Sequence, residues 1–292
     1  MKQIIKTLSG VALTAALLSG CEDPVNTNFG TGTVSVGIKD APVDGALEVV
    51  VSFTGIELKP YSGNAITINF NTPRNIDLLQ LQGTNTALLL DKASVAGGTY
   101  NWIRLKVNES ASYLTNSNGK HNLTIPSGNE TGLKVVNNFV VPQDGTIALT
   151  LDFDLRRSVL EPAQVGGAYQ LKPTLRLVQN DKSGHIGGTV ANTLVNATGC
   201  GTSAVYLFEG SGVSPDDLGG SGADPIDSSL VKLNNSGNYE YKIGFLAAGN
   251  YTIAFTCKAN LDNPESDDAS VTFSGATANI TVTAGATATR NF

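Results

Sequence analysis

The stretch GNYEYKIGFLAAGNYTIAF, residues 237–255, decides the fold class. Apolar and polar side chains alternate with a period of two on both sides of a turn that we expect at residues 244–248. A period of two is the pattern of a β-strand with one buried face. The stretch therefore predicts two consecutive strands and a β-rich second half of the chain.

The same period recurs in the first half of the chain. Val34, Val36 and Ile38 alternate with small or polar residues and Lys39, so one face of that strand is expected to be buried. The 32 glycines and the low charged fraction of 15% favour short strands joined by tight turns. Further strands are expected at residues 47–58 with a bulge near Gly55, 65–70, 76–81, 87–93 (or a short helix there), 103–107, 113–123 as a hairpin, 133–141, 146–155, 169–178, 186–190, 204–209, 230–233, 269–273, 278–282 and 286–292.

Breaks in this pattern divide the chain into five segments. The length suits two domains of about 100–150 residues each. The predicted fold is all-β, with two β-sandwich domains in tandem behind a lipoprotein signal peptide. The segments are a signal peptide at 1–20, a flexible tether at 21–33, a β-sandwich at 34–178, a polar linker at 179–185, and an immunoglobulin-like sandwich at 186–292.

The N-terminus has the layout of an export signal. Two lysines precede a short apolar run at residues 11–18, which is too short to span a bilayer as a mature helix. Leu18-Ser19-Gly20-Cys21 resembles the lipobox of bacterial lipoproteins. This resemblance implies that Cys21 is acylated and that the protein contacts the membrane through this lipid. The alternative is an ordinary secretory signal with a chance cysteine.

The residue after the cysteine bears on the predicted membrane. Aspartate at this position is the usual inner-membrane retention signal of lipoproteins, and the chain has Glu22 there. The expected location is therefore the cell envelope, with the outer membrane favoured.

With Cys21 lipidated, Cys200 and Cys257 remain as a pair in an exported protein. In that compartment an even pair usually forms a disulfide. The alternative is two free buried thiols.

The net charge of the chain restricts its partners. It is −6 for the full chain, and removal of residues 1–20 takes away two lysines and no acid, which gives −8. A mildly acidic surface argues against nucleic acid as a partner, because phosphates need basic patches. It also argues against electrostatic docking on anionic lipid.

The sequence offers little material for catalysis. His121 and His185 are expected to be exposed, and neither has an acid or a nucleophile at motif spacing. Asp152, Asp154 and Arg156 would share one face of a strand, and two such carboxylates could serve a glycosidase. The alternative is that arginines hold these carboxylates across strands and keep their pKa values low: Arg104, Arg156, Arg157 and Arg176. We favour the alternative and expect no enzyme and no catalytic residues.

Acidic loops in the second half raise the possibility of calcium, which binds six to eight oxygen ligands. The candidates are Asp262, Asp267 and Asp268, and solvated turns explain them equally well. We expect no other metal and no cofactor. Among the aromatic residues, Trp102, Tyr239 and Tyr251 could stack on a sugar or a partner, together with Asp152 and Asp154 as polar contacts; buried, the aromatic residues would be core.

Five motifs of the first half resemble one known family. They are VSVGIKDAPVD, LLLDKASVAGGTYNWIRLKV, IPSGNETGLKVVNNFVV, GTIALTLDFDLRRSV and YQLKPTLRLV, which lie in that family's order over residues 33–178. The family is the bacterial lipoprotein family called domain of unknown function 4382. The resemblance implies an all-β domain on an exported lipoprotein and no catalytic residues, because the family has none assigned.

The opening stretch, with the chain around it at 185–292, resembles the carboxypeptidase regulatory-like and transthyretin-like sandwiches. These share their shape with starch-binding-like modules, so the resemblance implies a spacer or a sugar-binding accessory domain. The expected function is a non-catalytic, lipid-anchored envelope lipoprotein in binding, adhesion or envelope assembly, with a protein or a polysaccharide as partner. The alternatives are a carbohydrate-binding accessory lipoprotein and a carboxylate-dependent glycoside hydrolase.

Overall fold

The computed structural model describes residues 30–41, 45–126, 132–160, 168–172 and 174–292, and it confirms the all-β fold class. The predicted signal peptide and Cys21 lie outside these residues. The strands are β1 (Thr31–Ala41), β2 (Ala46–Pro60), β3 (Ile66–Asp77), β4 (Ala87–Ala96), β5 (Gly98–Val107), β6 (Tyr113–Asn116), β7 (Gly119–Thr124), β8 (Leu133–Val141), β9 (Thr146–Asp154), β10 (Val159–Leu160), β11 (Tyr169–Leu171), β12 (Leu175–Gln179), β13 (Ser183–Val190), β14 (Ala204–Glu209), β15 (Asp227–Leu230), β16 (Lys232–Leu233), β17 (Tyr239–Ala247), β18 (Gly249–Thr256), β19 (Phe273–Val282) and β20 (Thr287–Thr289). Two short helices are α2 (Leu155–Ser158) and α3 (Asn192–Val195).

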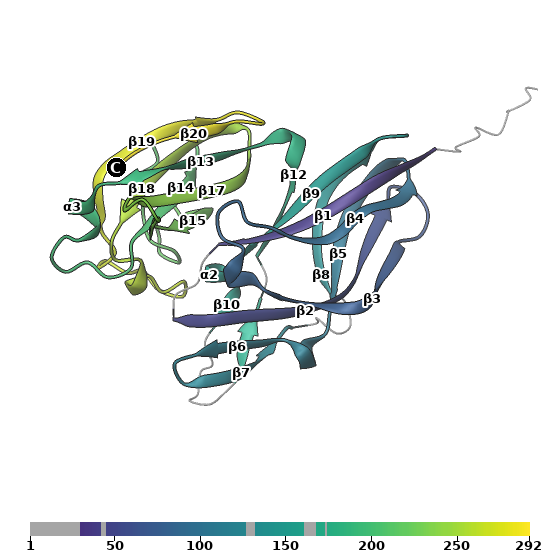
Figure 1. Ribbon diagram of the computed structural model, residues 1–292, viewed down its shortest axis with the longest axis horizontal. Helices are drawn as coiled ribbons and strands as arrows, with labels where there is room; N and C mark the ends of the chain where they lie inside the picture. Colours follow the sequence, from purple (N-terminus) through teal and green to yellow (C-terminus); the bar gives the residue numbers. More distant parts are fainter. Residues whose placement is uncertain (1–29, 42–44, 127–131, 161–167, 173) are drawn as a thin grey trace, which may run out of the picture.

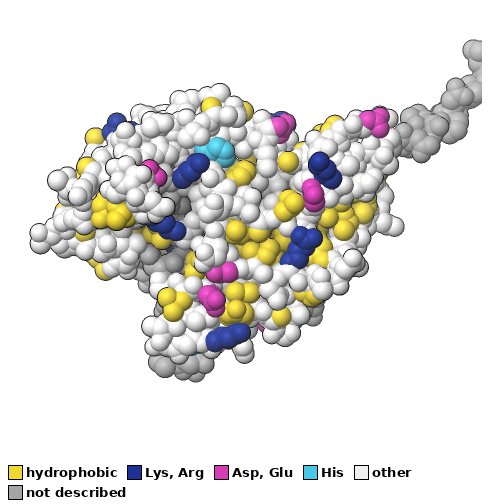
Figure 2. All heavy atoms as spheres, viewed as in Figure 1, with side chains coloured by type: hydrophobic (Ala, Val, Ile, Leu, Met, Phe, Trp, Pro, Cys, Tyr) yellow, Lys and Arg dark blue, Asp and Glu magenta, His cyan; other side chains and the backbone are white. Residues whose placement is uncertain are grey.

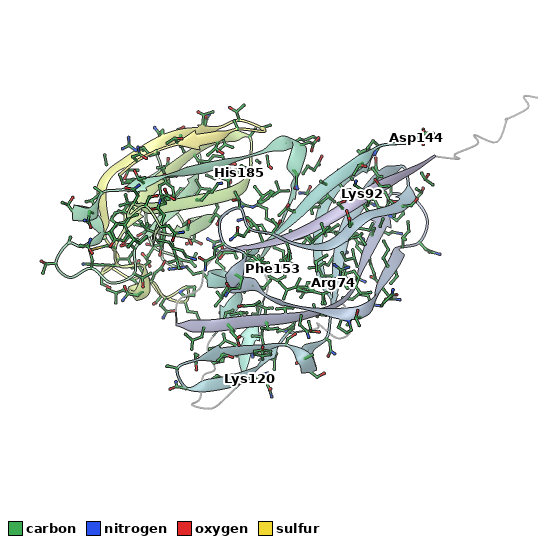
Figure 3. The ribbon with its side chains drawn as sticks, viewed as in Figure 1. Arg74, Lys92, Lys120, Asp144, Phe153 and His185 are labelled. Atoms are coloured by element: carbon green, nitrogen blue, oxygen red, sulfur yellow. A yellow bond between two sulfur atoms is a disulfide. The ribbon has the colours of Figure 1, made fainter. Side chains whose placement is uncertain are left out.

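Strands β1–β12 form what we call the first unit, a sandwich of two sheets. One sheet has the order β12-β9-β1-β4, and the other has the order β10-β11-β7-β6-β2-β5-β8 with β3 on β2. The apolar faces of both sheets meet in one core, where Phe53 of β2 contacts Phe153 of β9 edge to face at 6.3 Å between ring centroids. Figure 3 shows Phe153 in the interior of this unit.

Strands β13–β20 form the second unit, with two four-stranded sheets. Their orders are β16-β17-β13-β20 and β15-β14-β18-β19. The disulfide Cys200–Cys257, with 5.0 Å between the Cα atoms, confirms the predicted pairing. The two units lie side by side, the first in purple to teal and the second in green to yellow (Figure 1).

The opening stretch forms two strands as predicted, but its turn is shorter. Strand β17 runs to Ala247 and β18 begins at Gly249, so residues 244–247 belong to the strand. The two strands pair with different sheets, β17 with β13 and β16, and β18 with β14 and β19. Consecutive strands therefore cross from one layer of the second unit to the other.

Other strand predictions have mixed outcomes. The bulge near Gly55 is confirmed by the register shift between Phe53 and Gly55, and residues 87–93 are strand. The strand expected at 76–81 is wrong, because β3 ends at Asp77 and its side chain accepts a hydrogen bond from Leu79 to begin a 3-10 turn. The strand expected at 269–273 is also wrong, because β19 begins only at Phe273.

At the junction, the backbones of the two units come into close contact. The loop at Gly83 approaches β17 so closely that a Cβ atom on Gly244 would lie 2.4 Å from the carbonyl oxygen of Gly83. Residues 183–185 of the expected linker belong to β13, which begins directly after the 3-10 turn at Asn180–Lys182. Glycine at position 244 thus permits the two units to meet.

The surface of the protein is mixed in charge. Figure 2 shows acidic and basic side chains scattered on one face of the molecule, with apolar side chains between them. Within the described part of the chain, no helix has the length and apolar character needed to cross a membrane.

Candidate functional site

The carboxylates that the sequence offered for catalysis lie at the junction between the units. Asp152 and Asp154 share one face of β9, as predicted, while Leu151 and Phe153 are buried on the other face. Arg156 does not share that face, which corrects the prediction. Strand β9 ends at Asp154, whose Oδ1 accepts a hydrogen bond from the backbone N–H of Arg157 at 3.2 Å and so begins α2.

Two carboxylates and two cations from both units form one buried network. Lys39 Nζ of β1 lies 2.8 Å from Asp152 Oδ1 and 3.0 Å from Asp227 Oδ2, which belongs to β15 of the second unit. Arg176 of β12 contacts the same two carboxylates, with its Nη2 2.9 Å from Asp227 Oδ2. Each carboxylate therefore lies between two cations, and the network connects the units.

The sequence pattern placed Lys39 on the face of β1 opposite the valines. In the structure its side chain is only 2% exposed, because the second unit covers that face. Burial alone would lower the pKa of the Lys39 ammonium, but Asp152 and Asp227 outweigh burial and raise it. Lys39 is therefore a charged structural residue.

Arginine contacts do not keep the carboxyl pKa values low, which corrects that expectation. Burial raises the pKa of Asp154 from 3.8 to about 6, against the lowering effects of the Arg157 backbone hydrogen bond and charge. The pKa of Asp40, next to Lys39, is raised well above its usual value by burial, by Asp154 and by Asp152. Asp40 Oδ1 accepts a hydrogen bond from the Leu155 N–H at 3.2 Å, and Oδ2 has no hydrogen-bond partner among the described residues. Sequence reasoning missed Asp40, since nothing in its pattern marks it as buried.

A second set of contacts joins α2 to the second unit. Arg156 Nη1 lies 3.1 Å from Asp262 Oδ2, and it donates hydrogen bonds to the Tyr206 hydroxyl at 2.7 Å and the Ala259 carbonyl at 3.1 Å. The Tyr206 hydroxyl also contacts Asp262. Arg157 Nη2 pairs with Asp224 Oδ2 at 2.8 Å. Arginines of the first unit thus pair with acids of the second.

The three calcium candidates are only partly together. Ligand atoms of Asp262 and Asp268 come within 4.8 Å of one another and of Asp217, whereas Asp267 is outside this set. Each carboxylate of the set already accepts a hydrogen bond: Asp262 from Leu218, Asp268 from Asn263, and Asp217 from Asp268, all from backbone N–H groups. These bonds hold the acidic loops together.

The aromatic candidates divide between core and surface. Tyr251 is buried and its hydroxyl donates to the Ala247 carbonyl at 2.8 Å, and Tyr239 packs half-buried against the core of the second unit. These two therefore have core roles. Trp102 is half-buried on the outward face of β5, beside Arg104 and Lys134.

The two histidines are half-buried, not exposed as expected. His121 Nε2 shares a hydrogen bond with Asn116 Oδ1 at 3.0 Å, and His185 Nδ1 accepts one from the Phe245 N–H at 3.1 Å. Burial, Lys242 and Lys39 lower the pKa of His185. Both rings are thus held within the folded chain.

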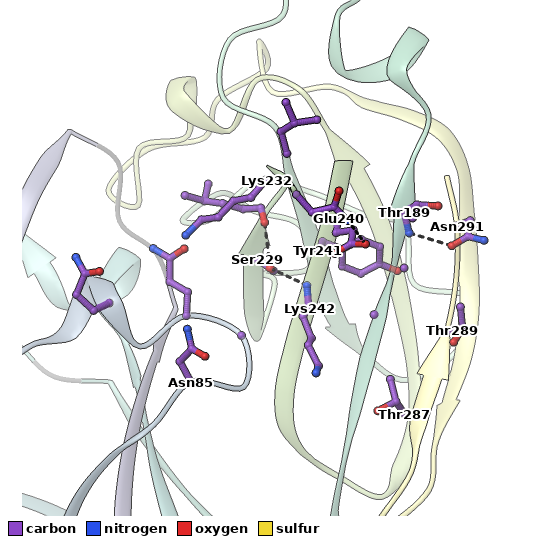
Figure 4. Close-up of a pocket in the computed structure, with 18 of the residues that line it drawn as sticks. Asn85, Thr189, Ser229, Lys232, Glu240, Tyr241, Lys242, Thr287, Thr289 and Asn291 are labelled. Atoms are coloured by element: carbon purple, nitrogen blue, oxygen red, sulfur yellow. Dashed lines mark hydrogen bonds between the residues drawn. The ribbon is translucent and has the colours of Figure 1, made fainter. Parts of the chain in front are cut away.

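A groove of about 630 Å³ lies between the units (Figure 4). One wall is the loop after the 3-10 turn of the first unit, which carries Asn85; the other is the outward face of β17, β13 and β20. Gly187 leaves a bare strip of backbone between these strands. The side chains around the groove are mostly amide, hydroxyl or charged, among them Gln82, Asn85, Glu240, Lys242, Thr287 and Thr289.

One polar atom of the groove wall lacks a partner within the protein. The Oε1 atom of Gln82 is buried and accepts no hydrogen bond from the described residues. A buried acceptor without a partner costs free energy. A smaller cavity of about 290 Å³ lies beside Asp152, Asp154 and Arg176.

Comparisons with solved structures give only distant similarity. The TIE protein of Bacillus anthracis is 10% identical, with 90% of this chain and 34% of that one covered, at a TM-score of 0.22. A minor pilin of Streptococcus agalactiae, GBS52, is 11% identical, with 88% and 94% covered, at 0.20. A putative adhesin from Bacteroides ovatus is 10% identical, with 94% and 88% covered, at 0.22. All three TM-scores are low, and the chain spans about a third of the length of the TIE protein.

The comparison with family models is more informative. No curated protein matches the chain. Residues 31–173 match the family described as "Domain of unknown function (DUF4382)", which confirms for the first unit the resemblance predicted from its motifs. From β1 almost to β12, the chain is thus similar to the domain of unknown function 4382 family.

Proposed function

We propose that the protein is a non-catalytic binding lipoprotein of the bacterial cell envelope, which binds a hydroxyl-rich ligand in the groove between its units. One observation carries this proposal. Asp152, one of the two acids singled out for chemistry, is held in ion pairs at the junction, while the same junction holds a polar groove of about 630 Å³ built from both units. Ligand sites commonly have volumes of about 300–1,000 Å³.

The ion pairs argue against a glycosidase. A glycosidase needs two carboxyl groups that flank the bond to be cut, one of them free to donate a proton. Asp152 is held by Lys39 and Arg176. Asp154 accepts a backbone hydrogen bond at the start of α2. Substitution of either residue would disturb the junction, so a structural role explains both.

The groove has the chemistry of a site for sugars. Amide and hydroxyl side chains can both donate and accept hydrogen bonds, as sugar hydroxyls do. Thr287 and Thr289 lie on one wall, and Asn85 lies on the opposite wall (Figure 4). These features favour a glycan ligand over an apolar one.

The lipid anchor belongs to the proposal and rests on the sequence alone. Acylation of Cys21 would tether the two units to a membrane of the envelope, with the outer membrane favoured. Several acyl chains hold a protein stably, whereas one chain binds only marginally. The groove would then be presented away from the membrane at the end of a tether shorter than expected, because β1 begins at Thr31 and includes residues 31–33 of the predicted segment 21–33.

A glycan array with the full chain, followed by calorimetry on the best binder, tests the groove. Thr287→Val with Thr289→Val removes two hydroxyls at nearly constant volume. We expect at least tenfold weaker binding, since two hydrogen bonds of about 1 kcal/mol each are lost. Thr277→Val, on the exposed part of β19 away from the groove, is the matched control and should bind like the wild type. Equal binding by all three proteins would contradict the groove as the site.

A protein partner is the second candidate, because envelope assembly was expected alongside sugar binding. Crosslinking on intact cells with identification of the captured proteins tests it. Capture of a protein that Thr287→Val with Thr289→Val abolishes, with no hit on the glycan array, would favour protein binding in the same groove.

A further inference from the structure

The outward face of the eight-stranded sheet of the first unit carries a cluster of cations around the single tryptophan. Trp102, Arg104 and Lys106 of β5 alternate with buried residues and so point away from the core. On β2, Lys59 lies opposite Trp102 and Glu57 opposite Arg104; on β8, Val136 lies opposite Trp102 and Lys134 opposite Arg104. We call these residues the basic face: Glu57, Lys59, Trp102, Arg104, Lys106, Lys134 and Val136.

Like charges directly opposite each other on paired strands destabilise a sheet. Arg104 and Lys134 form such a pair. The Trp102 ring lies 4.6 Å from the Arg104 guanidinium carbon and 4.9 Å from Lys134 Nζ, and Arg104 Nη1 lies 2.7 Å from Glu57 Oε2. Cation–π contacts and one half-buried ion pair thus act against this repulsion.

The basic face is opposite in charge to the rest of the molecule. Its four cations and one carboxylate give it a net charge of +3, while the chain carries −6. It lies on the first unit, and neither the groove between the units nor the smaller cavity beside Asp152 includes its residues. A positive, shallow surface on an acidic protein complements an extended anionic chain better than it does a small molecule.

We propose that the basic face binds an acidic polysaccharide, a sugar polymer with carboxylate groups. Arg104 and Lys134 would pair with its carboxylates, and Lys59 and Lys106 would contribute charge from the flanks. Val136 is 72% exposed beside Trp102, and together they offer apolar contact to the C–H faces of sugar rings. A polymer of phosphates alone would leave this apolar contact unused, and a membrane or nucleic acid would meet the acidic remainder of the molecule.

This proposal is independent of the groove between the units. The polar side chains that line the groove lie mainly on the loop at residues 79–85 and on β13, β15, β16, β17 and β20, and none of them belongs to the basic face. The threonine variants of the groove should therefore leave binding at the basic face unchanged. The two sites can be tested with different probes.

The test measures binding of the full chain to polygalacturonate, with dextran as the neutral polymer, phosphatidylglycerol vesicles as the anionic membrane and single-stranded DNA as the phosphate polymer. The variant Arg104→Gln with Lys134→Gln removes the central pair of charges. Lys134→Gln alone, at an exposed position of β8, serves as the variant with least risk to folding. The control, Lys92→Gln with Lys258→Gln, makes the same change in net charge elsewhere, with Lys92 on β4 of the other sheet (Figure 3).

We expect the wild type to bind polygalacturonate and not dextran, with affinity that falls as salt rises. The double variant should bind about five- to tenfold more weakly, as for the loss of two exposed ion pairs, and Lys134→Gln about two- to threefold more weakly. The control should bind like the wild type. The proposal is wrong if polygalacturonate does not bind at low salt, if the control loses as much affinity as the double variant, or if vesicles or DNA bind more tightly than polygalacturonate.

Discussion

At the scale of single residues, the buried charges were the hardest feature to predict. The period of two correctly predicted that the valines of β1 are buried. It placed Lys39 on a face exposed to solvent, because a pattern within one strand contains no information about a second unit that covers that face. Asp40 follows Lys39 and is 1% exposed. Its buried carboxyl lies near Asp152, Asp154 and Lys39, so three acids and one cation of the first unit lie close together.

The raised pKa of Asp154 predicts that the stability of the protein depends on pH. Its folded pKa of about 6 lies above the ordinary 3.8, so between these values the folded state binds more protons than the unfolded state. The contribution of Asp154 to stability is therefore fully present below about pH 4 and is lost as pH rises through about 6, by up to about 3 kcal/mol. Asp154→Asn keeps a good residue for the start of α2 and removes this titration.

Urea denaturation of both proteins from pH 4 to pH 7.5 measures the effect. The free energy of unfolding of Asp154→Asn, relative to the wild type, should rise with pH across this window and level off above about pH 7. A difference that stays constant with pH, or that moves in the opposite direction, would show that the Asp154 pKa is not raised in the folded protein.

At the scale of secondary structure, local pattern predicted strands well and their partners poorly. The bulge near Gly55 and the hairpin at 113–123 follow from local sequence, and both are present. Strands β17 and β18 were expected from one stretch, but their separation into two sheets depends on contacts with β13 and β14, which lie far away in the chain. The period of a strand does not indicate with which distant strand it pairs.

The disulfide joins the chain before β14 to the end of β18 and closes a loop with a sequence separation of 57. In the chain-entropy model a loop of this length stabilises the fold by up to about 4 kcal/mol. Cys200→Ser with Cys257→Ser should therefore lower the melting temperature of the second unit. Trp102 is the only tryptophan and lies in the first unit, so its fluorescence reports that unit separately.

We expect far-ultraviolet circular dichroism to show an earlier transition in the cysteine variant, while the Trp102 fluorescence transition stays within a few degrees of the wild type. Reduction of the wild type should reproduce the variant. Identical melting curves for variant and wild type would mean that the bridge adds no stability.

At the scale of the whole molecule, the sequence predicted the fold class and the family of the first unit but not the site. Composition and period gave an all-β chain, and the motifs gave the resemblance that the match over residues 31–173 confirms. Asp152, Asp154 and Arg156 were singled out correctly as unusual. Arg176 and Arg157 of the first unit pair with Asp152 and Asp154, as one alternative expected, whereas Asp262, which pairs with Arg156, belongs to the second unit. A contact between units requires their relative placement, which the sequence alone does not contain.

The anchor is a whole-molecule prediction from the sequence. Cys21→Ser should leave both units folded and release the protein from the membrane fraction, because the predicted acyl chains on Cys21 would be lost. Cys200→Ser with Cys257→Ser is the matched control and should stay with membranes. Flotation of Cys21→Ser with lipid would contradict the lipid anchor.

The junction network predicts that the two units behave as one body. Asp227 is the only member of the four-residue network that comes from the second unit, and it lies between Lys39 and Arg176. Asp227→Asn leaves buried Lys39 and half-buried Arg176 with a single carboxylate, so we expect a loss of up to about 3–5 kcal/mol, as for breaking other buried ion pairs. Asp224→Asn, which removes the exposed partner of Arg157, should cost at most about 1 kcal/mol.

Two measurements separate a loss of stability from a loss of rigidity between the units. Denaturation gives the free energies, and small-angle X-ray scattering gives the radius of gyration of each folded variant. We expect a larger radius for Asp227→Asn than for Asp224→Asn, because the surviving contacts at Gly83 and Arg156 hold the junction less tightly. If both variants match the wild type in radius and stability, the groove between the units does not depend on the network. Its two walls would then have to be held together by the remaining contacts alone.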